Sequence, residues 1–155
     1  MATTFSVSRS ATIDADPALV HRLVDDLREW RSWSPWEDAD PHLERSYTGP
    51  ERGVGARYAW SGNRRAGRGS MEITGSTPEQ VDLLLVLKRP FRATDQAVFR
   101  LLPRRGGTEV TWRTTGRRTG VLGVLGVLGR VVPVDRVLGR DVERGLARLT
   151  EVAEA

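Results

Sequence analysis

The C-terminal segment has the most regular pattern of apolar residues in the chain. Between residues 131 and 152 these residues recur every three or four positions, which is the period of one face of an α-helix. Pro133 suits a first helical turn, because the N–H that proline lacks has no partner there. A helix from Pro133 to Glu154 would be about 33 Å long, so its apolar stripe needs a broad partner surface. The stripe consists of Val131, Val134, Leu138, Val142, Leu146, Leu149 and Val152.

The rest of the chain can supply that surface. Polar and apolar residues alternate there with a period of two, and turn-forming residues separate the alternating segments, which predicts strands. Because short loops join most of these segments, the strands should form an antiparallel meander with one apolar face. The predicted strands cover residues 5–13, 43–47, 56–61, 70–74, 81–87, 94–102 and 108–114.

A short helix and a tryptophan-rich corner are expected between the first two strands. Asp16 can cap the helix and Pro17 can begin it. The corner then places Trp30, Trp33 and Trp36 within seven residues. A tryptophan buries on the order of 200 Å² but carries an N–H donor, which favours half-wet positions. The corner is therefore either a packed part of the core or the wall of a pocket, and different tryptophans can do each.

Composition excludes several classes of protein. The chain of 155 residues predicts one domain over residues 1–155, and without cysteine it has no disulfide or thiolate chemistry. No cluster of histidine and acidic residues has metal-ligand spacing, so no metal or cofactor is expected. We find no signal peptide and no apolar window long enough to span a membrane, which predicts a cytoplasmic protein. The net charge is +4, but the arginines gather at predicted turns rather than on one face, so no nucleic-acid partner is expected.

Residues 120–129 form a Gly-Val-Leu triplet repeat. A period of three matches neither a strand nor an α-helix, and each glycine costs a helix about 1 kcal/mol relative to alanine. The repeat is either an apolar connector under the last helix, or a mobile lid or peripheral membrane contact. We expect it to fold over a cavity mouth near Trp33 and Trp36 as a loose helical turn or loop.

Short motifs are spaced along the whole chain. They are Trp30-x-x-Trp33-Ser34-Pro35-Trp36 with Asp40-Pro41, Gly53-Val54-Gly55-Ala56, Tyr58-x-Trp60-x-Gly62-Asn63, Gly67-x-Gly69-Ser70-Met71-Glu72-Ile73, Gly107-Thr108-x-Val110-Thr111-Trp112, and Gly145-Leu146-x-x-Leu149. With these motifs the sequence resembles the SRPBCC superfamily, which includes START, pollen-allergen and polyketide cyclase/dehydratase-like proteins. The resemblance implies an α+β helix-grip fold, in which a curved antiparallel sheet of about seven strands wraps a long C-terminal helix, with two short helices after the first strand. It also implies a deep apolar cavity.

The wedge between such a sheet and its helix is a natural ligand pocket. Gly145 interrupts the helix stripe, where it either leaves space or allows close backbone packing. The predicted ligand-binding residues are Trp33, Trp36, Tyr58, Trp60, Met71, Ile73, Leu85, Phe99, Leu101, Val110, Trp112, Leu138, Val142, Gly145 and Leu146.

Catalytic signals are sparse. The two histidines, His21 and His42, are both expected at the surface, which leaves no Ser-His-Asp arrangement. The grouped acids at positions 37, 38 and 40 are also expected to be surface residues. Tyr58 is the one inward-facing phenol, and it is the candidate for polarising a substrate carbonyl.

The leading functional hypothesis is a binding protein for a hydrophobic small molecule, lipid-like or polyketide-like. The first alternative is a polyketide cyclase or dehydratase that works without metal or cofactor. The second is a protein-interaction or stress-related module with a filled core. Such a protein would be a monomer or a homodimer.

Overall fold

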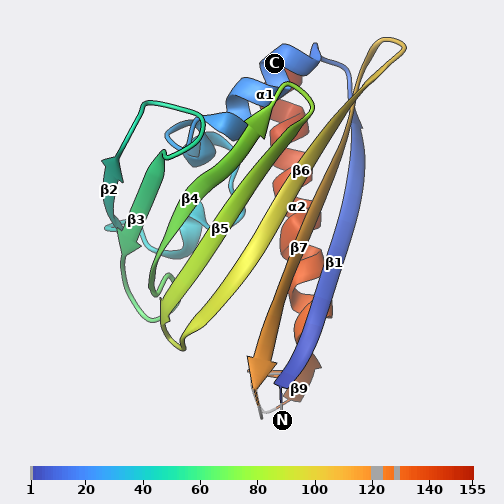
Figure 1. Ribbon diagram of the computed structural model, residues 1–155. Helices are drawn as coiled ribbons and strands as arrows, with labels where there is room; N and C mark the ends of the chain where they lie inside the picture. The colour runs from blue at the N-terminus through green and yellow to red at the C-terminus, as the bar shows by residue number, and fades with distance from the viewer. Residues whose placement is uncertain (1, 120–123, 128–129) are drawn as a thin grey trace.

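A seven-stranded antiparallel sheet forms most of the protein (Figure 1). The computed structural model describes residues 2–119, 124–127 and 130–155. The strands lie in the order β1-β7-β6-β5-β4-β3-β2, so β2 to β7 form a meander and β1 joins its edge beside β7. The predicted antiparallel meander is therefore confirmed. The strands are β1 (Ala2–Ile13), β2 (Glu44–Thr48), β3 (Arg57–Ser61), β4 (Arg68–Thr77), β5 (Gln80–Arg89), β6 (Ala93–Arg104) and β7 (Gly107–Thr119).

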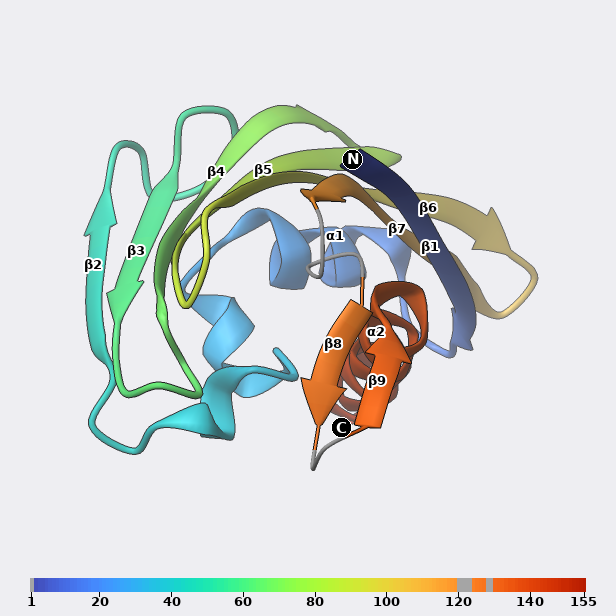
Figure 2. The ribbon, with the colours of Figure 1, turned by 90° about the horizontal axis from the view of Figure 1, so that it is seen from below.

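Helical segments lie inside the curve of the sheet (Figure 2). The first, α1 (Pro17–Asp25), begins as predicted. A side-chain oxygen of Asp16 accepts a hydrogen bond from the backbone N–H of Ala18 at 2.9 Å, and the helix starts on a proline. This helix packs across β5, β6 and β7.

The tryptophan-rich corner after α1 contains two short 3₁₀ turns in place of the expected second helix. They are η1 (Glu29–Ser32) and η2 (Glu37–Ala39). Pro35 lies between them. Since proline has no N–H to continue a helical hydrogen-bond ladder, the chain bends there instead of extending one helix.

The long helix α2 (Val134–Glu154) lies inside the sheet and packs mainly along β1. It starts one residue later than predicted, because Pro133 ends a strand. Its buried residues include Val142 and Leu146, as the stripe predicted. No helix in the described part of the chain, α2 included, is long and apolar enough to cross a membrane.

Polar contacts fix α2 to β1. Nε of Arg9 lies 2.9 Å from a carboxylate oxygen of Glu143, and the backbone N–H of Asp14 donates to the Glu154 carboxylate at 2.9 Å. A curved antiparallel sheet that holds a long C-terminal helix in this way is the helix-grip α+β fold.

The part of the Gly-Val-Leu repeat that is described is a strand. Here β8 (Val124–Val127) pairs with β9 (Arg130–Pro133) in an antiparallel hairpin. The expected helical turn or loop is therefore wrong for residues 124–127, since backbone pairing with the next segment satisfies their N–H and C=O groups. Residues 120–123 and 128–129 lie outside the described residues. The prediction that the repeat covers a cavity mouth falls largely on them, so it stays a prediction.

Candidate functional site

A cavity of about 210 Å³ opens at one end of the concave face of the sheet. The strands β3, β4 and β5 supply most of its apolar wall, while the tryptophan-rich corner and α2 close the other side. The exposed side chains of Arg65 and Arg89 stand at its rim. It is lined by Trp30, Ser34, Trp36, Glu37, Ala39, Leu43, Tyr58, Trp60, Arg65, Ala66, Met71, Leu85, Leu87, Arg89, Pro90, Asp95, Arg118 and Leu138.

The predicted ligand-binding residues divide into two groups. One group lines the cavity: Trp36, Tyr58, Trp60, Met71, Leu85 and Leu138. The other belongs to the packed interior: Trp33, Ile73, Phe99, Leu101, Val110, Trp112, Val142, Gly145 and Leu146. Both groups face inward, as strand and helix periodicity predicted. The second group differs because α1 packs across β5, β6 and β7 there, and the ring of Trp33 lies edge-on to Phe99 and Trp112.

Gly145 belongs to the close-packed part of the interior. A Cβ atom built on it would lie 2.7 Å from Cζ3 of Trp112 and 3.0 Å from Cδ of Pro35. Its missing side chain therefore lets an indole and a proline ring approach the helix backbone and does not enlarge the cavity.

The three tryptophans of the corner occupy different environments. The indoles of Trp30 and Trp33 are buried and donate to backbone carbonyl oxygens of α1, each at 2.9 Å. Trp36 is 37% exposed and donates to the carboxylate of Asp141 on α2 at 3.2 Å. Trp33 is thus core, Trp36 is cavity wall, and Trp30 contributes to both.

An ion pair lies in the cavity wall, and neither of its residues is among those predicted from the sequence. Asp95 of β6 and Arg118 of β7 meet at 2.8 Å and 3.0 Å through both carboxylate oxygens. Their side chains are only 4% and 3% exposed. A signal existed, because Asp95 alternates with the inward-facing Ala97 and Phe99, and Arg118 alternates with the inward-facing Trp112. Charged residues at inward positions of two strands predict a buried pair.

A second pair borders the cavity near Tyr58. Glu37 and Arg45 form an ion pair, with side chains 12% and 18% exposed. The hydrogen bond from Arg45 to Glu37 raises the pKa of the guanidinium. Burial, and next the negative charge of Glu37, raise the pKa of Tyr58 to about 12. The phenol is therefore neutral at physiological pH, so it can donate a hydrogen bond but cannot serve as a base.

The expectation that the grouped acids lie on the surface is wrong for two of them. Glu37 is largely buried through its pairing with Arg45. Asp40 is buried and accepts hydrogen bonds from the backbone N–H groups of His42 and Asn63, each at 2.8 Å. These two bonds lower the pKa of Asp40. They join the corner to the β3–β4 turn and so shape the mouth of the cavity.

His21, which was expected at the surface, is half-buried beside β4. Its Nε2 lies 3.3 Å from the Ser76 hydroxyl, which donates to the Asp25 carboxylate at 2.7 Å. The hydroxyl stands between the imidazole and the carboxylate, whereas a catalytic triad places the imidazole in the middle. The described residues also contain no group of three or more metal-ligating side chains.

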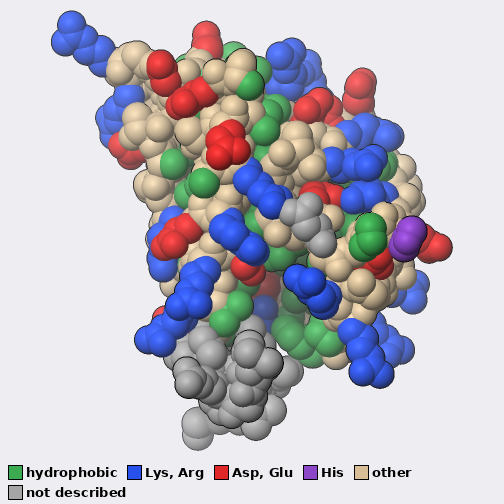
Figure 3. Space-filling model, turned by 180° about the vertical axis from the view of Figure 1, so that it is seen from behind, with side chains coloured by type: hydrophobic (Ala, Val, Ile, Leu, Met, Phe, Trp, Pro, Cys, Tyr) green, Lys and Arg blue, Asp and Glu red, His purple; other side chains and the backbone are tan. Residues whose placement is uncertain are grey.

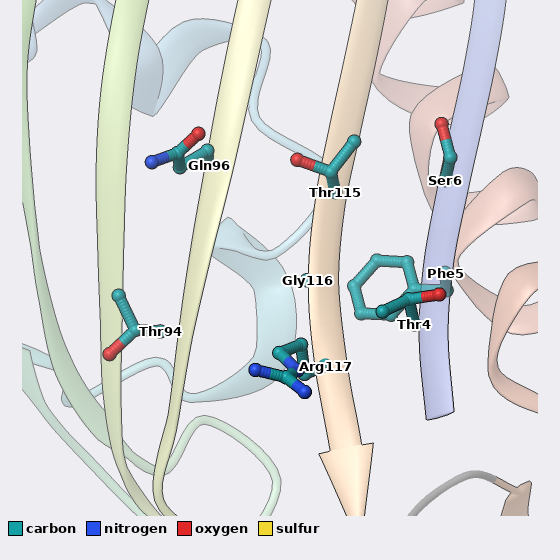
Figure 4. Close-up of a pocket in the computed structure, with 8 residues that line it drawn as sticks. All are labelled: Thr4, Phe5, Ser6, Thr94, Gln96, Thr115, Gly116 and Arg117. Carbon is teal, nitrogen blue, oxygen red and sulfur yellow. The ribbon is translucent and has the colours of Figure 1, made fainter. Parts of the chain in front are cut away.

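A shallow depression on the outer face of the sheet is a weaker candidate (Figure 4). It crosses β1, β6 and β7, and polar side chains such as Gln96 and Thr115 project around it. It lacks the continuous apolar wall that a hydrophobic ligand needs. The opposite side of the molecule, which carries the helices, shows Lys and Arg side chains interspersed with Asp and Glu (Figure 3).

Solved structures share this fold at low sequence identity. An uncharacterised protein from Rhizobium leguminosarum superposes with a TM-score of 0.69 at 13% identity, over 99% of this chain and 97% of that chain. The di-domain ARO/CYC protein BexL from the BE-7585A biosynthetic pathway gives 0.66 at 16% identity, over 98% of this chain and 50% of BexL. DynU16, from the dynemicin biosynthetic locus, gives 0.64 at 16% identity, over 97% of this chain and 47% of DynU16.

Sequence comparison identifies the family. No curated protein matches the chain. The sequence profile of the family described as polyketide cyclase / dehydrase and lipid transport matches residues 4–154, which is nearly the whole chain. The protein therefore belongs to the polyketide cyclase/dehydrase and lipid transport family, an SRPBCC-type family.

Proposed function

We propose that the protein binds a hydrophobic, ring-bearing small molecule in the cavity between the sheet and α2. The observation that carries this proposal is the apolar wall formed by Trp60, Met71, Leu85 and Leu138 around about 210 Å³ of space. A dry apolar cavity of about 150 Å³ is enough to bind benzene, so this one suits a molecule of one or two rings. Membership of a polyketide-handling and lipid-transport family supports the same class of ligand.

A cavity-filling substitution tests the proposal. Leu85 lines the cavity, and its neighbour Leu84 lies on the opposite face of the same strand. Leu85→Trp should weaken binding of one-ring and two-ring aromatic ketones and short lipids by about tenfold or more, measured by titration calorimetry. Leu84→Trp adds the same side chain outside the cavity and should leave affinity nearly unchanged. Failure of the whole panel to bind the unmodified protein, or equal effects of the two variants, would contradict the proposal.

A cyclase or dehydratase activity is the second candidate, favoured by the position of Tyr58. Its phenol borders the cavity and stays neutral, so it can donate to a ketone oxygen as charge develops there. Tyr58→Phe should then slow cyclisation of a poly-β-ketone substrate about a hundredfold, while a non-reactive ring ketone still binds. Unchanged turnover in Tyr58→Phe would remove this role. The open cavity does not favour the third hypothesis, an interaction module with a filled core.

A further inference from the structure

The buried pair in the cavity wall leaves part of Arg118 without a partner. An arginine side chain has five N–H donors in a fixed planar arrangement. Two of them bind the Asp95 carboxylate, and Nη1 also donates to the carbonyl oxygen of Arg117 at 3.0 Å. Among the described residues, neither the buried Nε–H nor the second N–H of Nη2 has an acceptor. These two donors lie along one side of the guanidinium and form a fork that fits an oxygen acceptor.

The surroundings of Arg118 hold this fork in place. The guanidinium carbon lies 4.9 Å from the ring centre of Phe5 and 5.1 Å from that of Phe91, both within the range of cation–π attraction. Asp95 has room only because Gly116 lacks a side chain, since a Cβ there would lie 2.1 Å from its Oδ1. Two rings and one glycine therefore position the pair, and both partners border the cavity.

The stability of the folded protein does not by itself explain why this ion pair is present. A buried ion pair contributes about as much as apolar residues of the same volume, or less. A buried N–H without an acceptor adds a further cost, because it has given up its hydrogen bonds to water. An acceptor supplied by a bound molecule would remove that cost at the moment of binding.

We propose that the free fork of Arg118 receives a neutral carbonyl oxygen of the bound molecule and makes the cavity selective for ring ketones. Asp95 already neutralises the guanidinium, so a carboxylate would bring a second negative charge beside it and would lose its hydration without a net positive partner. A carbonyl oxygen accepts two N–H bonds at a much smaller desolvation cost. This inference rests on the proposed ligand-binding function and deepens it by naming the chemical class.

Three probes with one carbon skeleton test the inference. Tetralin has no acceptor, 1-tetralone has a ring carbonyl, and 1,2,3,4-tetrahydro-1-naphthoic acid has a carboxylate at the same position. Titration calorimetry of the unmodified protein should show 1-tetralone binding about tenfold or more tighter than tetralin, and the acid binding more weakly than the ketone. The carbonyl stretch of bound 1-tetralone should also move to lower frequency than in an apolar solvent.

Two variants separate the fork from the ion pair. Arg118→Lys keeps the charge beside Asp95 but removes the planar fork. The double variant Asp95→Leu/Arg118→Met replaces the pair with apolar residues and leaves no buried charge unpaired. Both should bind tetralin at least as well as the unmodified protein does and should lose the preference for 1-tetralone together with the shifted carbonyl stretch. Circular dichroism and thermal melting check that each variant is folded.

The outcomes distinguish selectivity for a ketone at Arg118 from ligand binding in the cavity as such. If tetralin and 1-tetralone bind the unmodified protein equally, or if both variants keep the ketone preference, the pair is structural and the inference fails while ligand binding stands. If the acid binds tightest and loses that advantage in Arg118→Lys, the site takes an anion and the neutral-acceptor rule is wrong. If none of the probes binds, the proposed function for two-ring molecules fails, and this inference fails with it.

Discussion

The two ends of the concave face share one sequence pattern but differ in what covers them. At the end near α1, alternate strand residues such as Leu83 and Phe99 are buried, and the Phe99 ring lies edge-on to Trp33. At the opposite end, Leu85, two residues along from Leu83, borders the cavity. Between these two positions β4 and β5 keep one register, with Ile73 opposite Leu83 and Met71 opposite Leu85. The difference therefore comes from the elements that cross the concave face. A pocket forms in this fold where these elements line the face without packing directly against it.

The largest test of this comparison removes one tryptophan from each end. Trp112→Ala at the filled end should lower the free energy of unfolding by about 3–5 kcal/mol, because the ring is fully packed and its loss leaves a void. Trp60→Ala at the open end should cost only about 1–2 kcal/mol, since its ring is half-buried and already borders empty space. Denaturant unfolding measures both values. Equal losses would mean that the two ends are packed alike.

The ion pair provides a second test at the open end. Arg118→Met alone leaves the Asp95 carboxylate buried without a partner and should destabilise the protein by about 3–5 kcal/mol. The double variant Asp95→Leu/Arg118→Met should recover most of that loss. Chemical denaturation of the two variants side by side gives the comparison, and a double variant as unstable as the single one would mean that the pair itself stabilises the fold.

The two interior glycines of α2 form a smaller, matched test. A methyl group on Gly145 would meet Trp112 and Pro35 in the filled end, so Gly145→Ala should cost about 1–2 kcal/mol after the gain in helix propensity. A methyl group on Gly139 would meet only the flexible end of the Arg9 side chain, at 2.5 Å from Nη2. Gly139→Ala should therefore be neutral or stabilise the protein by up to about 1 kcal/mol. Thermal unfolding compares them, and the same sign of change in both would contradict the argument.

Alkaline pH should produce the smallest effect, and it should arise at the open end. The pKa of Tyr58 is about 12 in the folded protein and about 10 in the unfolded chain. Its contribution is complete below pH 10 and is lost as the pH rises toward 12, because the unfolded chain releases the proton first. Unfolding curves between pH 9 and 12 should therefore show a shallower loss of stability in Tyr58→Phe than in the unmodified protein. Identical slopes would mean that the folded structure does not hold the phenol in its neutral form.

Much of the architecture was predictable from local patterns. Alternation of polar and apolar residues located the strands and their inward faces, and the stripe with a period of three or four located α2. Capping chemistry at Asp16 and Pro17 located the start of α1. The limits are also local, because Pro133 satisfies the rules for a first helical turn yet lies in β9.

The candidate site was predictable only in part, for a reason of sequence distance. Alternation says that Tyr58, Met71 and Leu85 face inward, and all three border the cavity. The same alternation applies to Phe99 and Trp112, which lie in the packed interior. Nothing within a strand says which of its inward residues a helix from elsewhere in the chain will cover.

The sequence by itself determined the periodicities, and with them the sheet, the last helix and the set of residues turned inward. Only the tertiary structure decided where the interior stays open and which charges meet inside it. Asp95 and Arg118 stand 23 residues apart and are brought together by the pairing of β6 with β7. Burial then makes the two charges depend on each other, since a charge removed from water needs a partner within hydrogen-bond reach. Local propensity acts over a few neighbouring residues, whereas desolvation and packing depend on whichever groups the fold brings into contact.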